Sequence, residues 1–210
     1  MSLTDTFTSL MNAARQEYDL NHKIGFAELT KIIKPNPNLA KGTDDYSGNL
    51  WGYYVPTDVT DKFNGLTVKA VYGGAHIGPI VTVPAGDYTY SFFVKPVDKI
   101  GNFYAKARGF DFTTMQENAN TQSVIAGAIK GTDWQRVSFT FKNIKAGSYV
   151  FMAENWPGTV WVAGQKVESG PYTTPYYAAD NRLITAPEVG GVTSALYLLL
   201  LPNLEVMAWE

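Results

Sequence analysis

A two-residue alternation over residues 88–95 constrains the fold of this chain more than any other feature. Tyr88, Tyr90, Phe92 and Val94 share one side of the segment, and Thr, Ser, Phe and Lys residues alternate with them on the other. Successive side chains of a β-strand point to opposite faces, so this pattern is typical of a strand with one buried face. The segment therefore predicts a half-buried strand of an antiparallel sheet.

The same alternation returns further along the chain. Residues 134–142 place Val137, Phe139 and Phe141 on one face and Arg, Ser, Thr and Lys residues on the other. Runs of aromatic and β-branched residues between turn residues predict further strands at 66–72, 80–83, 103–113, 149–153 and 159–167. About eight strands joined by Gly-rich turns are typical of a jelly roll. We therefore expect a mainly β fold, a jelly-roll β-sandwich.

The two ends of the chain depart from this pattern. Residues 3–33 carry apolar side chains at three- and four-residue spacing after a capping Thr4 or Asp5, and the pattern stops at Pro35. This predicts a short N-terminal helical extension of two helices. The end of the chain, residues 181–210, carries an apolar stretch at 195–201 and is predicted to be an assembly contact or an extra strand. The expected divisions are a helical segment at 1–34, a jelly-roll domain at 35–180 and a C-terminal extension at 181–210.

Charge and composition exclude several classes of partner. A formal net charge of -2 provides no basic field for phosphates, which argues against nucleic acid and anionic membrane as partners and leaves neutral ligands such as sugars. Without cysteine the chain has no disulfide, thiolate nucleophile or cysteine-ligated zinc. The apolar run at 192–201 is half the roughly 20 residues that span a bilayer, so we expect no membrane insertion. The N-terminus lacks the regions of a secretion signal, which predicts synthesis in the bacterial cytoplasm without a signal peptide.

Catalytic and metal-binding motifs are hard to find. His22 and His76 lie in unrelated segments outside any ligand-spaced motif, and the Gly73-Gly74 pair predicts a loop rather than a phosphate cradle. A glycosidase needs two convergent carboxylates, for which the sequence offers five without a pattern: Asp111, Glu117, Asp133, Glu154 and Glu168. Loop acids could instead bind calcium or cap turns: Asp44, Asp45, Asp58, Asp61 and Asp180. We predict no enzyme, and calcium is the one possible cofactor.

Aromatic residues give the better functional signal, because the apolar faces of sugars stack on rings while their hydroxyls bond to neighbouring polar groups. Trp156 follows Asn155 in a turn and is the leading candidate, although packing against a neighbouring loop is the alternative for every ring named here. Trp134 and Trp161 lie in regular strand patterns and are assigned to structure. The candidate carbohydrate-binding residues are Trp51, Tyr53, Tyr54, Tyr104, Lys106, Arg108, Asn155 and Trp156.

Two parts of the sequence resemble known families. The blocks at 88–95, 133–141, 161–170 and 174–176 resemble, in order and spacing, the carbohydrate-binding-module-like jelly rolls of phage tail proteins. The opening Asn-Leu, Gly-Thr and Trp pattern of those domains is matched by Asn38-Leu39, Gly42-Thr43 and Trp51. Residues 3–15 and 23–29 are similar to a short helical module on tail and baseplate proteins of phages that infect Gram-positive bacteria.

The resemblance implies a virion protein of the phage tail or baseplate. Its N-terminal segment would attach to other tail proteins or oligomerise, and its sandwich would bind host cell-wall or surface polysaccharide during adsorption. The apolar N-terminal stripe and the 192–201 run also favour a homo-oligomer. The alternatives are a structural baseplate or decoration protein without a ligand, and a cell-wall glycoside hydrolase.

Overall fold

The computed structural model describes residues 37–53, 56–111, 113–114, 116–118, 120–171, 173–174, 176–178, 183–184, 186 and 188–189, together with Thr8 and Asn12. Apart from Thr8 and Asn12, the predicted helical segment at 1–34 lies outside these residues, as does the apolar stretch at 195–201. Among the described residues, no helical stretch reaches the length and apolarity that crossing a bilayer requires.

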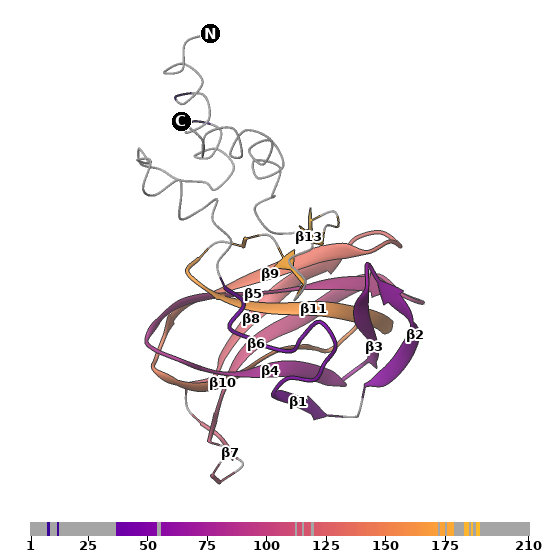
Figure 1. Cartoon of the computed structure of the whole chain (residues 1–210). Coiled ribbons are helices and arrows are strands. Elements are labelled where there is room, and N and C mark those ends of the chain that lie inside the picture. The colour runs from indigo at the N-terminus through magenta and orange to yellow at the C-terminus, as the bar shows by residue number, and fades with distance from the viewer. Residues whose placement is uncertain are drawn as a thin grey trace.

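The described chain is nearly all β and folds as two sheets packed into a sandwich (Figure 1). Sheet 1 has the strand order β1 (Leu50–Tyr53), β4 (His76–Val83), β10 (Gly147–Glu154), β6 (Gly101–Asp111) and β7 (Gln116–Glu117), and β8 (Gln122–Ile129) also pairs with β6. Sheet 2 has the order β14 (Glu188–Val189), β9 (Gln135–Ile144), β5 (Gly86–Pro96), β11 (Thr159–Ser169), β3 (Leu66–Tyr72) and β2 (Thr57–Phe63). The predicted mainly β jelly-roll sandwich is confirmed, and each strand range predicted above overlaps an observed strand.

The main core lies between the two sheets. Tyr88, Tyr90, Phe92 and Val94 of β5 all belong to it, as the alternation predicted. They meet aromatic rings from β6, β9 and β10: Phe103, Phe139, Phe141, Tyr149 and Phe151. Aromatic side chains bury large apolar areas, so this ring cluster is the chief source of hydrophobic stabilisation.

The outer face of β5 is also largely buried, which corrects the prediction of a half-buried strand. Phe93 points away from the main core yet is fully buried, because Tyr176, Ala178 and Ile184 pack over it. Tyr176 meets its ring edge-on at 5.6 Å. β12 (Tyr176–Tyr177) and β13 (Leu183–Ile184) pair in this covering segment, and β14 then joins sheet 2 parallel to β9. Sheet 2 therefore includes β14, a strand within the segment 181–210.

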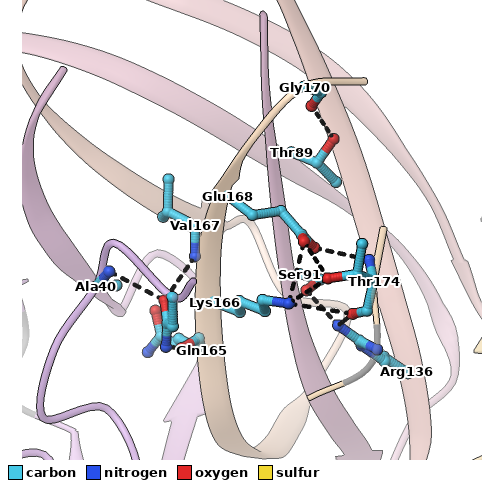
Figure 2. A network of polar contacts seen from close by, with 11 residues as sticks. Ala40, Thr89, Ser91, Arg136, Gln165, Lys166, Val167, Glu168, Gly170 and Thr174 are labelled. Carbon is cyan, nitrogen blue, oxygen red and sulfur yellow. Dashed lines mark hydrogen bonds and ion pairs between the residues drawn. The ribbon is translucent and has the colours of Figure 1, made fainter. Parts of the chain in front are cut away.

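A buried polar network fastens this covering segment to sheet 2 (Figure 2). The Lys166 ammonium lies 3.0 Å from the Glu168 carboxylate and donates to the Thr174 hydroxyl. The Thr174 amide donates to the other Glu168 oxygen, and Arg136 donates to the Thr174 carbonyl at 2.8 Å. Buried charges persist only when they are paired and hydrogen-bonded; here Lys166 and Glu168 pair with each other, and both bond to Thr174. With this segment in place, the outer face of sheet 1 is left for function.

Candidate functional site

Polar and aromatic side chains of β6 stand on the outer face of sheet 1. Phe103, Ala105 and Ala107 are fully buried in the main core, so Tyr104, Lys106 and Arg108 point the other way. Tyr104 is 39 % exposed, which makes it one of the few large apolar side chains that the described chain leaves open to solvent. The structure thus brings these three predicted candidates together on one surface.

β10 supplies the acidic member of this surface. In the antiparallel pair of β6 and β10, Glu154 lies directly opposite Tyr104, and Met152 lies opposite Lys106. The Lys106 ammonium forms an ion pair with the Glu154 carboxylate, and the side chains are 29 % and 16 % exposed. Tyr104 therefore presents its ring beside a charged pair whose oxygen and nitrogen atoms reach solvent.

Trp51 lies across the middle of the same face. Its strand position is opposite Gly78, which has no side chain to block the indole. The indole centroid lies 4.8 Å from that of Phe110, with the rings tilted by 49°. Together with Ile80 they cover Val150 and Met152, which are fully buried. Trp51 itself is partly exposed and gives the face a second ring.

His76 begins β4 and is almost completely buried. Burial lowers the pKa of His76; Glu154 opposes the shift, whereas Arg108 and Lys106 add to it. The imidazole is therefore neutral at pH 7, and its Nδ1 lies 3.2 Å from the Gly74 carbonyl, which fixes the proton on Nδ1. No sequence motif marked this residue, because only strand pairing brings it beside the charged pair.

A shallow depression of about 360 Å³ adjoins this face at the β1 and β4 edge. Its connection to the face is Ile80, whose amide donates to the Asn49 carbonyl at 2.9 Å and whose strand position is opposite Val150. No sequence pattern indicated this depression. The lining residues are Leu39, Lys41, Gly42, Ser47, Gly48, Asn49 and Ile80.

Trp156, the leading candidate from the sequence, is a core residue. Only 6 % of it is exposed, and its ring stacks on Phe103 with centroids 4.7 Å apart. The indole nitrogen donates to the Ala75 carbonyl at 2.9 Å. A ring enclosed in this way has no face left for a sugar, so the packing alternative describes Trp156. Asn155 is exposed in the same turn, whereas the side chain of Tyr53 and all of Tyr54 lie outside the described residues.

The five candidate carboxylates are dispersed. Glu168 is on the outer face of sheet 2, opposite to Glu154, and Asp133 precedes β9 of sheet 2. Asp111 is seven residues beyond Tyr104 on β6, about 24 Å along the strand, and it accepts the Thr113 amide. The side chain of Glu117 is not described. Among the others, none lies beside Glu154 as a glycosidase pair requires.

Two of the candidate calcium ligands have other roles in the structure. Asp45 accepts the Ser47 amide in a turn, and Asp58 pairs with Lys69. Asp180 lies outside the described residues. Within the described ranges, no group of three or more His, Asp or Glu side chains is placed to hold a metal ion.

Comparison with known proteins yields similar structures but no similar sequences. No family model and no curated protein matches the chain. TmCBM61 in complex with β-1,4-galactotriose is 17 % identical over 64 % of this chain and 99 % of its own, with a TM-score of 0.43. The CBM22-1 xylan-binding domain from Paenibacillus barcinonensis Xyn10C is 11 % identical over 73 % of this chain and 98 % of its own, with a TM-score of 0.44.

A third similar structure is the enzymatically active domain of bacteriophage CBA120 tailspike protein 4, which is 12 % identical over 65 % of this chain, with a TM-score of 0.40. This chain spans only 21 % of that tailspike chain. Carbohydrate-binding modules are thus among the solved structures to which the protein is similar.

Proposed function

We propose that this protein is a non-catalytic accessory protein of a phage tail or baseplate, and that it binds host-surface polysaccharide through the outer face of sheet 1 during adsorption. The observation that carries the binding proposal is the placement of Tyr104. Its exposed ring stands beside the Lys106–Glu154 pair, on the face that Trp51 also occupies. A pyranose can stack on such a ring while its hydroxyls bond to the ammonium and carboxylate.

The tail assignment rests on the resemblance of residues 3–29 and of the strand blocks to phage tail proteins. Under this assignment the protein resides in the virion, contacts other tail proteins and acts as a homo-oligomer. Several copies on one particle would convert weak single-site binding into stable attachment, because linked sites rebind at high effective concentration. Light scattering of the full chain at micromolar concentration tests the oligomer, and a strictly monomeric protein would contradict it.

Affinity electrophoresis through gels that contain soluble polysaccharide tests the binding face. The panel holds xylan, β-1,4-galactan, mixed-linkage β-glucan and wall polysaccharide from Gram-positive cells. We expect at least one of them to retard the wild-type protein, and Tyr104→Ala to weaken that affinity about tenfold, as for loss of a ring worth about 1.4 kcal/mol.

Tyr72→Ala is the matched control, since Tyr72 is 58 % exposed on β3 of sheet 2 and lies off the proposed face. Equal retardation of wild type and Tyr104→Ala would remove the face from consideration. A wild-type protein that passes unretarded through every gel would contradict carbohydrate binding itself.

A further inference from the structure

The depression at the edge of sheet 1 is formed by a loop that is fixed in place. The Asn38 side chain accepts the amides of Ala40 and Val167 at 2.9 and 3.1 Å, and donates to the Gln165 carbonyl at 3.0 Å. The buried Thr43 hydroxyl donates to the same carbonyl. The loop from residue 38 to β1 is thereby fastened to β11, so its exposed rim is held in one conformation.

Two glycines form the closest crossing in this loop. The Gly48 amide donates to the Gly42 carbonyl at 3.1 Å, and a Cβ on Gly48 would lie 1.9 Å from the Lys41 carbonyl oxygen. Gly42 has a φ of +70°, a left-handed conformation that glycine adopts at low cost. The hollow therefore depends on the absence of side chains at both positions, and it is present before any ligand arrives.

The lining of the depression suits one sugar unit. Leu39 and Ile80 provide apolar walls, and Lys41, Ser47 and Asn49 are exposed polar side chains at the rim. Its 360 Å³ lies near the lower end of the roughly 300–1,000 Å³ range of small-molecule sites. An apolar wall with a few hydrogen-bonding groups matches the faces and hydroxyls of a pyranose.

The distance from this hollow to Tyr104 sets the length of ligand. Ile80 is opposite Val150 and Tyr104 is opposite Glu154, four residues further along β10. Four residues of strand are about 14 Å, and the two strand spacings from β4 to β6 add roughly 10 Å at right angles, which gives a diagonal of about 17 Å. Trp51 lies on the same face, where it packs with Ile80 against Val150 and Met152. A disaccharide is too short to bridge this diagonal.

The geometry points to an extended binding site, in which the depression holds one unit of a glycan chain whose neighbouring units run over the outer face of sheet 1 toward Tyr104. The ligand class is therefore an internal stretch of a linear polysaccharide or a long oligosaccharide, not a monosaccharide or disaccharide. This inference rests on the proposed function of the face.

Calorimetry with xylo-, cello- and β-1,4-galacto-oligosaccharides, from the disaccharide to the hexasaccharide, tests the inference. For the series that the wild-type protein binds, we expect affinity to rise beyond the disaccharide. A Lys41→Ala/Asn49→Ala double variant should lose about tenfold in affinity for the hexasaccharide and bind the shortest active oligomer as wild type does. Lys99→Ala, in an exposed loop outside the lining of the depression, is the matched control. Circular dichroism checks that each variant is folded.

The outcomes separate the two proposals. An affinity that levels off at the disaccharide, or a double variant that binds the hexasaccharide like wild type, overturns the extended site while Tyr104→Ala still tests the face. Loss of binding in the double variant but not in Tyr104→Ala contradicts the proposed role of Tyr104 and, with it, a site that extends from the depression to that ring. No binding of any oligosaccharide, together with no retardation by any polysaccharide in the gels, overturns both.

Discussion

Replacing Trp156 tests whether its ring is a structural part of the core or a contact for a ligand. Trp156→Ala removes a buried indole that stacks on Phe103 and meets Phe92 edge-on at 6.0 Å. Large-to-small changes of this kind cost about 3–5 kcal/mol. Trp156→Phe keeps an aromatic ring but loses the donor to the Ala75 carbonyl, and an unsatisfied buried acceptor costs about 1–3 kcal/mol. Both variants should therefore unfold more easily than wild type, Trp156→Ala by the larger amount.

Urea denaturation followed by circular dichroism measures these losses. In a domain of this size each kcal/mol lost lowers the melting temperature by about 2–4 °C, so in thermal denaturation we expect Trp156→Ala to melt roughly 10 °C below wild type. Retardation by polysaccharide, measured well below the melting temperature, should be unchanged in Trp156→Phe because the ring touches no ligand. A Trp156→Phe protein with wild-type stability but no retardation would refute the assignment of this ring to the core.

Two further predictions concern a glycine and a buried lysine. Gly78→Ala should lower the free energy of unfolding, measured by urea denaturation, by at least about 2 kcal/mol, because its Cβ would lie 2.1 Å from the Phe151 carbonyl oxygen. Gly74→Ala, with open space around the new atom, should stay within about 0.5 kcal/mol of wild type. Equal effects of the two substitutions would contradict the close approach at Gly78. Burial lowers the pKa of Lys166 to about 8, although Glu168 opposes the shift, so the unfolded chain binds more protons than the native chain between pH 8 and 10.5. The free energy of unfolding should therefore rise with pH across that window by up to about 3 kcal/mol. NMR should show one lysine that titrates near pH 8, and its signal should be absent from Lys166→Met. Titration of every lysine near pH 10.5 would contradict this prediction.

Tyrosines limit the window of the lysine effect. Burial raises the pKa of Tyr176 to about 12, and it also raises the pKa of Tyr88, Tyr90 and Tyr149. Their unfolded forms lose protons near pH 10 while the native forms keep theirs, so stability falls above that pH. The lysine contribution is therefore read most clearly between pH 8 and 10.

Local pattern was enough to predict the strands and the inner faces of β5 and β9, because alternation is a property of the backbone itself. The burial of Phe93 could not be predicted in the same way. It depends on a segment more than eighty residues later in the chain, and no local signal shows where that segment lies. Local pattern also left open whether Trp156, in its turn, faces solvent or packs against the protein. The turn after β10 folds against Gly73, whose carbonyl accepts the Trp156 amide, and this carries the indole into the core.

The candidate face likewise combines residues that the sequence pattern indicated with residues that only strand pairing brings together. Tyr104, Lys106 and Arg108 were placed on one side of a strand because they are spaced two residues apart. Glu154 and His76 join them only through the pairing of β10 with β6 and β4, which sequence spacing does not reveal. The depression depends on a loop that crosses itself at two glycines, and turn composition alone does not specify such a crossing.

The contact between Trp51 and Phe110 has a consequence for the thermodynamics of binding. Because Phe110 and the buried methionine beneath hold the indole, its rotamer is chosen during folding and not when a ligand arrives. Ordering a free side chain at an interface costs roughly 0.5–1.5 kcal/mol, and a ring already held in position avoids that loss. A glycan would meet a rigid surface, so the entropy lost on association would come from the sugar chain and not from this ring.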